Sequence, residues 1–236
     1  YPAVEYRAPD PDAVDLYRFV VELSRQMKAS DVVVPESSGA AGEVTYQAIQ
    51  AKRGQSIKNA AGLGAMGFGL PYAIGSCIAM DKRRTILING DGALQLNIQE
   101  FETLRRLDLP VKIFVLENGG YASIMATQTK LFDGFLVGAN AESGLTVPDI
   151  VHVARGYRLK TATIATDADL ESGIAEVLNE DGPVVCSVRV RLDQETIPKV
   201  QSIRLPDGKM KSGALDNMWP TLAEEEIAAS KWDFDE

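Results

Sequence analysis

Two stretches decide the fold of this chain: residues 88–93, Ile-Asn-Gly-Asp-Gly-Ala, and residues 117–121, Glu-Asn-Gly-Gly-Tyr. Each follows a short apolar run (85–88 and 112–116) with the composition of a buried strand. The segment 97–107 between them carries apolar residues at helical spacing, which indicates a strand, a helix and a second strand. Because parallel strands end at a common edge, we expect Asp91 and Asn118 to lie close together there.

The residue types at this edge favour a ligand site. A carboxylate, an amide oxygen and a backbone carbonyl suit octahedral Mg²⁺, which keeps its other positions for water and phosphate oxygens. Glycines beside Asp91 allow the backbone to approach a diphosphate closely. The alternative is that each stretch is a plain turn. Either stretch alone would favour a turn, but both together at strand ends favour a metal and phosphate site.

The same alternation extends to both sides of these stretches. Further strands are expected at 32–34, 159–162 and 184–190, and a further helix at 167–179. The first helix is expected over 11–29, with Asp10 as its N-cap and Pro11 in its first turn. The pattern predicts an α/β fold in which a parallel sheet is sandwiched between helices. The apolar face of the first helix is expected at Leu16, Val20, Leu23 and Met27.

Composition excludes several classes of protein. The chain has 236 residues, of which 45% are hydrophobic and 24% charged, as in ordinary globular proteins. A net charge of −9 argues against a nucleic-acid surface. The sequence has no apolar run approaching the roughly 20 residues of a membrane span, and no signal peptide at its start, so a cytoplasmic location is expected.

Cysteine and histidine are too few for a soft-metal site. Cys77 and Cys186 lie far apart in apolar runs and are expected to be reduced thiols of the core. With His152 as the one histidine, a Cys/His metal cluster is excluded and an iron–sulfur cluster is disfavoured. Any metal is therefore expected to be a hard cation with oxygen ligands.

Three parts of the chain are distinguished by composition. Residues 1–10 begin with Tyr1 and resemble a linker from a missing upstream domain. Residues 11–190 are expected to form the binding domain. Residues 191–236 are polar and poor in periodicity, and we expect an irregular C-terminal extension. Two interpretations of this extension stay open, a lid over the site and an ordinary surface-packed tail.

The paired stretches resemble the thiamine-diphosphate motif, Gly-Asp-Gly followed some two dozen residues later by Asn-Asn. The segment 62–71, Gly-Leu-Gly-Ala-Met-Gly-Phe-Gly-Leu-Pro, is similar to the segment before that motif in the acetolactate synthase group. Segments 99–104, 109–112 and 212–222 are also similar to that group. The chain thus resembles the C-terminal thiamine-diphosphate-binding (PP) domain of an acetolactate-synthase-like enzyme.

The resemblance assigns residues to three parts of a cofactor site. The magnesium ligands would be two side chains and one carbonyl oxygen: Asp91, Asn118 and Gly120. The diphosphate is expected at three segments: Ser38, Gly39, Ala40, Ala41, Gly92, Ala93, Tyr121, Ala122 and Ser123. The last segment opens a helix, and helix N-termini favour anions. The aminopyrimidine is expected at Gly64 and Met66, with the Met66 side chain as the wedge that bends the cofactor. The alternative for Met66 is a core methionine.

Two positions depart from the family pattern, and one motif has a second interpretation. Glu117 replaces the first Asn of the usual pair and is not assigned to the metal. The turn 37–42 lacks the Gln-His pair of acetolactate synthases, which weakens the case for acetolactate synthesis itself. Glycines at 62, 64 and 67 match the dinucleotide fingerprint, but that fingerprint must follow a strand. No strand is expected in the polar segment 54–59.

The resemblance implies part of a thiamine-diphosphate-dependent lyase or transferase that decarboxylates or joins 2-oxo acids. The activating glutamate is expected on a pyrimidine-binding domain of the same or a partner subunit. No catalytic residue is therefore assigned here, and Glu100 and Glu102 are expected to be structural or surface residues. A homodimer or homotetramer is expected, and the isolated chain is expected to be inactive. Two alternatives stay open, the β-subunit of a two-chain 2-oxo-acid decarboxylase and a non-catalytic cofactor-binding module.

Overall fold

The computed structural model describes residues 9–60, 62–191, 194–200 and 202–230. Residues 1–8 of the expected linker lie outside this range. The chain divides into two compact units between Gln194 and Glu195, and each is described by itself. The first unit contains α1 Leu16–Gln26, β1 Val32–Pro35, α2 Gly39–Ala48, β2 Ser56–Ile57, α3 Gly69–Ala79, β3 Thr85–Gly90, α4 Asp91–Leu94, η1 Gln95–Glu100, α5 Phe101–Leu107, β4 Val111–Glu117, α6 Ala122–Leu131, η2 Ala141–Ser143, α7 Ile150–Gly156, β5 Lys160–Ile164, η3 Asp167–Asp169, α8 Leu170–Asn179 and β6 Val184–Arg189.

The first unit is built on a six-stranded sheet with the order β2-β1-β3-β4-β6-β5. Every neighbouring pair of strands is parallel. The central strands are buried along almost their whole length, because helices cover both faces of the sheet. This burial explains why their sequences are continuous apolar runs. The predicted parallel sheet between helices is confirmed.

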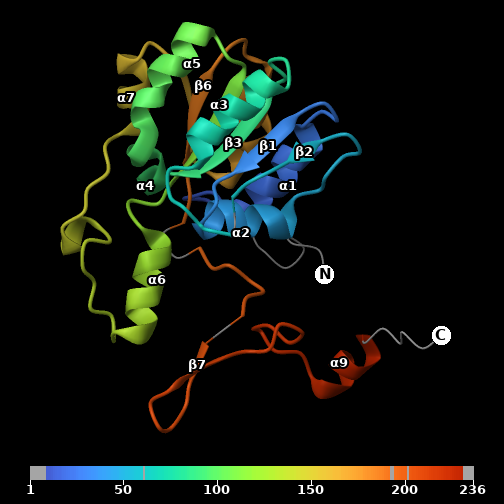
Figure 1. Ribbon diagram of the computed structural model, residues 1–236, viewed down its shortest axis with the longest axis vertical. Coiled ribbons are helices and arrows are strands. Elements are labelled where there is room, and N and C mark those ends of the chain that lie inside the picture. The colour runs from blue at the N-terminus through green and yellow to red at the C-terminus, as the bar shows by residue number, and fades with distance from the viewer. Residues whose placement is uncertain (1–8, 61, 192–193, 201, 231–236) are drawn as a thin grey trace. The chain divides into compact units, whose positions relative to one another are not determined.

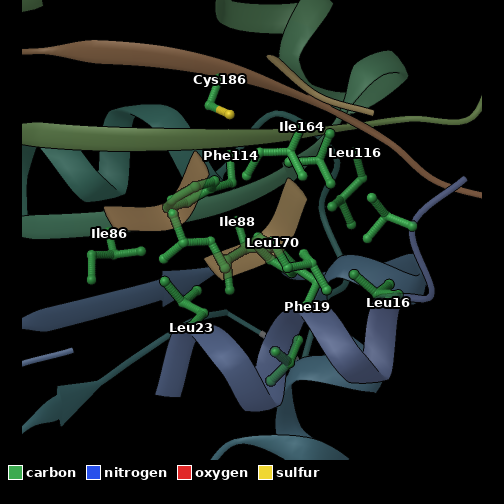
Figure 2. Close-up of a cluster of buried hydrophobic side chains, with 14 of the residues drawn as sticks. Leu16, Phe19, Leu23, Ile86, Ile88, Phe114, Leu116, Ile164, Leu170 and Cys186 are labelled. Carbon is green, nitrogen blue, oxygen red and sulfur yellow. The ribbon is translucent and has the colours of Figure 1, made fainter. Parts of the chain in front are cut away.

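Two hydrophobic clusters fill the two sides of the sheet. One cluster includes the buried faces of α1, α2 and α8, and the other includes those of α3, α5 and α7. Figure 1 shows α1 and α2 on one side of the sheet and α3, α5 and α7 on the other. In the first cluster Phe19 meets Phe114 edge-on, with ring centroids 5.2 Å apart, among the side chains drawn in Figure 2. Cys77 and Cys186 are buried, one in each cluster, and both are unpaired as predicted.

The first helix is shorter than predicted, and its N-cap is Asp15 rather than Asp10. The Asp15 carboxylate accepts hydrogen bonds from the N–H groups of the first turn. The Asp10 carboxylate instead accepts from two N–H groups shortly after it, at residues 12 and 13. Val14 is extended because it forms a parallel bridge with Val190, so no helix can pass through it. The predicted apolar face is confirmed, with Leu16, Val20, Leu23 and Met27 all buried.

The segment after β3 is broken into α4, η1 and α5 instead of one helix that starts at residue 97. The backbone of Asn97 is non-helical, with φ at −140°. Its side chain donates a hydrogen bond to the Gly67 carbonyl at 2.5 Å, which ties it to a distant loop. Asn97 is therefore not a helix cap. Phe101 and Leu104 are buried as predicted, while Leu107 is half-buried.

The polar segment 54–59 contains a strand that was not expected. Strand β2 pairs with β1 at the edge of the sheet, with Val32 opposite Ser56 and Val33 opposite Ile57. This pairing uses backbone groups, so a two-residue edge strand needs no apolar run.

A lysine is buried at the amino edge of the sheet. Lys112 is 1% exposed, and its Nζ donates to the carbonyl oxygens of Glu180 and Gly182, the latter at 2.6 Å. Burial lowers the pKa of Lys112 to about 8, and the positive charge of Arg84 acts in the same direction. The lysine thus ties β4 to the C-terminal end of α8.

The second unit contains β7 Ser202–Arg204, β8 Met210–Ser212 and α9 Glu224–Ser230. The two strands pair antiparallel. Lys199 pairs with Trp219 through backbone hydrogen bonds, and its Nζ lies 5.8 Å from the centre of a Trp219 ring. The lid and the surface tail remain predictions for residues 191–236. Across the described parts of the chain, none of the helices is long and apolar enough to cross a membrane.

Candidate functional site

The topology of the sheet places a crevice between the ends of β1 and β3. The chain leaves β1 toward β2 on one side and returns to β3 on the other. The connecting helices α2 and α3 cover opposite faces of the sheet. Their loops therefore separate at the carboxyl ends of β1 and β3, where open α/β sheets bind ligands.

A cavity opens at this edge, and all of the site residues expected from the sequence line it. Three connections supply them, after β1, β3 and β4, together with the loop before α3. These residues are Ser38, Gly39, Ala40, Ala41, Gly64, Met66, Asp91, Gly92, Ala93, Asn118, Gly120, Tyr121, Ala122 and Ser123. The fold thus brings together residues that are separated by up to 85 positions (123 − 38) in the sequence.

Two ten-residue helices begin at the cavity. Their N-cap residues are Ser38 for α2 and Tyr121 for α6, and neither side chain caps its helix. The first N–H groups of a helix have no intrahelical partner and carry the positive end of its dipole. Both helices therefore present N–H groups that could receive an anion such as a diphosphate.

Two glycines permit close packing at the cavity. A Cβ on Gly92 would lie 2.5 Å from the Tyr121 ring, so a side chain there would displace the start of α6. Gly120 has φ +157°, and a Cβ there would collide with the carbonyl oxygen of Ala139. Each glycine brings backbone to the cavity where a larger residue would move it away.

Asp91 is held by the backbone around it. The residue is 3% exposed, and its Oδ1 accepts from the Gly92 N–H at 2.7 Å. Its Oδ2 accepts from the N–H groups of Asn118 at 3.1 Å and Gly119 at 2.8 Å, which joins the ends of β3 and β4. Burial raises the pKa of Asp91, the three hydrogen bonds oppose this rise, and the nearby Glu117 charge adds to it.

The Asn118 amide lies between two oxygens, Oδ1 of this carboxylate and the carbonyl oxygen of Gly120. The end of the Asn118 amide that faces them lies 2.7 Å from the Gly120 carbonyl oxygen and 3.2 Å from Asp91 Oδ1, and an amide oxygen at this end would face two further oxygens. Oxygens without hydrogens repel one another at such distances. Two arrangements remove the conflict: the Asn118 amide turns its nitrogen inward and donates to both oxygens, or a cation lies among the three oxygens.

The two separations around the Asn118 amide are close to those between neighbouring ligands of a small octahedral cation. Neighbouring ligands about 2.1 Å from a Mg²⁺ ion are about 3 Å apart, between the two separations found here. Among the described residues no cluster of three His, Cys, Asp or Glu side chains could hold a metal ion. A cation at this edge would therefore depend on the amide and carbonyl oxygens together with the single carboxylate of Asp91.

Met66 lies in the loop before α3 and is half-buried at the cavity. It belongs to neither hydrophobic cluster, which disfavours the alternative of a core methionine. Gly64, two residues earlier, has φ +59° and also lines the cavity.

The sequence did not identify the remaining residues that line the cavity. Glu36 follows β1 and is 1% exposed; a carboxylate at a strand end next to the glycine turn was the available signal. Gly90 and Ile124 are direct neighbours of predicted residues. The others come from the start of α1 and the ends of β4 and β6, which only the tertiary fold joins: Leu16, Leu116, Val190, Arg191 and Gln194.

The acidic residues of the next helical segment lie elsewhere. Glu100 accepts a hydrogen bond from the Thr103 hydroxyl at 2.7 Å, and Glu102 pairs with Arg105 at 2.5 Å. Neither glutamate lines the cavity.

The chain resembles known proteins in sequence and in fold. Residues 38–188 match the family described as "Thiamine pyrophosphate enzyme, C-terminal TPP binding domain", where thiamine pyrophosphate is thiamine diphosphate. The chain is 31% identical over 156 residues to the acetolactate synthase isozyme 1 large subunit of Escherichia coli, covering 66% of this chain and 27% of that protein. It is 30% identical over 192 residues to the isozyme 2 large subunit of the same organism, covering 81% and 33%.

A solved structure shows the same fold. The thiamine diphosphate-dependent 4-hydroxybenzoylformate decarboxylase of Rhodococcus jostii RHA1 superposes with a TM-score of 0.68 at 26% identity, covering 80% of this chain and 34% of that chain. The chain spans about a third or less of the length of each of these relatives. The family match covers more than half of the chain and contains all the site residues expected from the sequence, from Ser38 to Ser123. The chain therefore belongs to the family of C-terminal thiamine-diphosphate-binding domains of thiamine-diphosphate enzymes, of the acetolactate-synthase-like kind.

Proposed function

We propose that this chain holds magnesium and thiamine diphosphate for a larger enzyme that decarboxylates 2-oxo acids, joins them, or does both. The family supports the cofactor, and the position of the Asn118 amide between the Asp91 carboxylate and the Gly120 carbonyl oxygen carries the proposal of magnesium. When bound, the cofactor supplies a carbanion that adds to a 2-oxo acid and stores the electrons released on decarboxylation.

The residues of this chain would bind and orient the cofactor. The oxygens of Asp91, Asn118 and Gly120 would hold the cation, which would supply positive charge to offset the diphosphate. The N-termini of α2 and α6 would direct N–H groups at the phosphate oxygens. Gly64 and Met66 would meet the aminopyrimidine, with the Met66 side chain beneath the bend of the cofactor.

The cavity has few charges of its own to offset a diphosphate. Among the described lining residues the acidic side chains are Glu36 and Asp91, and the basic one is Arg191. Arg191 forms an ion pair with Asp10 at 2.9 Å. A divalent cation would therefore supply most of the positive charge that a bound diphosphate needs.

The activating glutamate is proposed to come from a pyrimidine-binding domain of the same or a partner subunit in a homo-oligomer. The fold assigns this chain to cofactor binding, so we expect no turnover of 2-oxo acids by the 236-residue chain alone. Measurable decarboxylation of pyruvate by this chain would contradict the assignment of the activating glutamate to another domain.

Calorimetric titration of thiamine diphosphate into the chain tests the proposal. With Mg²⁺ present we expect saturable binding, and with EDTA we expect it to be lost, because the diphosphate would then face the Asp91 carboxylate without a cation. Binding of equal strength in EDTA would refute the metal assignment, and absence of binding under both conditions would refute the cofactor site in this chain.

A further inference from the structure

Glu36 is a buried carboxylate with an unusual set of partners. It follows β1, is 1% exposed and lines the cavity. Its Oε1 accepts from the N–H of Ser37 at 2.9 Å and from the Ser37 hydroxyl at 3.0 Å. Its Oε2 accepts from the Gly69 N–H at 3.1 Å. Within the described part of the chain no basic side chain pairs with it, so these hydrogen bonds compensate for the burial of its charge.

The partners of Glu36 belong to two different parts of the site. Ser37 lies in the turn that leads into α2, and Gly69 is the first residue of α3. The Ser37 hydroxyl also lies 2.7 Å from the carbonyl oxygen of Ala65, between Gly64 and Met66. Because the hydroxyl has one proton, it can donate to Ala65 or to Glu36 at any moment, but not to both.

The packing around Gly69 leaves little freedom for this arrangement. A Cβ on Gly69 would lie 2.7 Å from Glu36 Oε2 and 3.1 Å from a methyl group of Leu87. The loop that carries Gly64 and Met66 is therefore fixed at its end by the Glu36 carboxylate and at its middle by the Ser37 hydroxyl. Both contacts start from the turn that opens α2.

We propose that Glu36 is a positioning residue. It fixes the loop that carries Gly64 and Met66, the aminopyrimidine loop, at a set distance from the turn 37–42, the diphosphate turn. This inference rests on the proposed function, because it assumes that the loop and the turn hold opposite ends of one cofactor. Glu36 acts through Ser37 and Gly69, and it is not among the residues assigned to the metal or the diphosphate. Its effect is to let one ligand reach both subsites together.

The test compares a ligand that spans both subsites with one that occupies a single subsite. Thiamine diphosphate with Mg²⁺ reaches the loop and the turn, whereas pyrophosphate with Mg²⁺ reaches the turn alone. Glu36→Gln replaces one of the two acceptor oxygens with an NH2 group that cannot accept, so the N–H of either Ser37 or Gly69 loses its hydrogen bond. We expect Glu36→Gln to weaken thiamine diphosphate binding about tenfold, as for one lost hydrogen bond to a charged group, and to leave pyrophosphate binding unchanged within about twofold.

Two further variants complete the design. Glu43→Gln makes the same chemical change on the exposed side of α2 and should leave both affinities unchanged. Ser37→Ala removes the hydrogen bond from the Ser37 hydroxyl to the Ala65 carbonyl oxygen without changing charge. It should also weaken binding of thiamine diphosphate and leave binding of pyrophosphate unchanged. If Glu36→Gln does not fold, as judged by circular dichroism, the result for Ser37→Ala decides.

The outcomes separate this inference from the proposed function. Absence of binding of both ligands to the unmodified chain would refute the proposed function. Binding of both ligands, with Glu36→Gln and Ser37→Ala weakening them equally or not at all, would overturn the positioning role alone. The same conclusion would follow if thiamine diphosphate bound the unmodified chain no more tightly than pyrophosphate.

Discussion

Replacement of Asp91 by asparagine isolates the charge of the proposed metal site. The carboxylate accepts three backbone N–H groups with two oxygens, whereas asparagine has one acceptor oxygen. Each lost hydrogen bond to a charged acceptor costs about 1.5–3 kcal/mol. Burial raises the pKa of Asp91, which shows that its charge is costly to bury, so removal of this charge offsets part of the loss. We therefore expect Asp91→Asn to fold, with a free energy of unfolding about 1–3 kcal/mol below that of the unmodified chain.

Asp91→Asn should also remove nearly all of the stabilisation that bound ligand gives to the folded chain. Thiamine diphosphate with Mg²⁺ at 100 times its dissociation constant stabilises the folded chain by about 2.7 kcal/mol. For a chain of this length that corresponds to a rise in melting temperature of about 5–11 °C. If Asp91→Asn weakens binding about a thousandfold, the same ligand concentration contributes less than about 0.1 kcal/mol, which is below about 1 °C.

Thermal unfolding followed by circular dichroism, with and without ligand, measures this difference. Asp81→Asn is a matched control, because Asp81 is exposed and lies after α3, in a connection at the opposite edge of the sheet. This control should keep the full rise in melting temperature. A rise in Asp91→Asn equal to that of the control would refute the role of this carboxylate.

Three further predictions follow from the packing. Gly92→Ala forces its new Cβ against the Tyr121 ring and should weaken binding of thiamine diphosphate with Mg²⁺ by at least about tenfold in calorimetry, since the start of α6 must move; unchanged affinity would contradict this. Phe19→Ala removes a fully buried ring that packs on Phe114 and should lower the free energy of unfolding by about 3–5 kcal/mol in urea titrations, and a loss below about 1 kcal/mol would contradict the packing. The pKa of Lys112 is about 8 in the folded chain, below its ordinary value of 10.5. Between pH 8 and pH 10.5 the lysine is therefore mostly deprotonated in the folded chain and mostly protonated in the unfolded chain, so the free energy of unfolding should rise with pH in this range. The free energy of unfolding relative to Lys112→Met should grow by up to about 1.4 kcal/mol per pH unit between pH 8 and 10, and a flat or falling difference would contradict the assignment.

The central part of the fold could be predicted from sequence because its signals are local. The apolar runs of β3 and β4 are continuous, since both faces of the sheet are covered, and glycines follow each strand. Strand ends in a parallel sheet share one edge, so the site follows from the topology. The proximity of Asp91 and Asn118 therefore needed no knowledge of other contacts.

The errors arose where distant contacts decide local structure. Asp10 and Asp15 are equally good helix caps by type, but the Asp167 carboxylate accepts N–H groups from both and a bridge at Val14 keeps the segment between them extended. Asn97 has the composition of a cap, yet its amide is engaged by a loop thirty residues earlier. Such contacts leave no periodic trace in the sequence.

The missed lining residues have the same explanation. Leu16, Val190 and Gln194 belong to segments at the two ends of the first unit, and only their packing brings them to the cavity. Glu36 was the exception, because it directly precedes the predicted diphosphate turn. A carboxylate directly after an apolar strand and before a glycine turn was the signal that could have identified it.

The location of the bound metal tests the central claim most directly. Crystals of the chain grown with thiamine diphosphate and Mn²⁺, which can replace Mg²⁺ and scatters anomalously, would show its position. We predict an anomalous peak coordinated by Asp91 Oδ1, the Asn118 side-chain oxygen and the Gly120 carbonyl oxygen, with a diphosphate oxygen completing part of the octahedron. A diphosphate bound in the cavity without metal at these oxygens, and with the Asn118 nitrogen turned inward, would contradict the account.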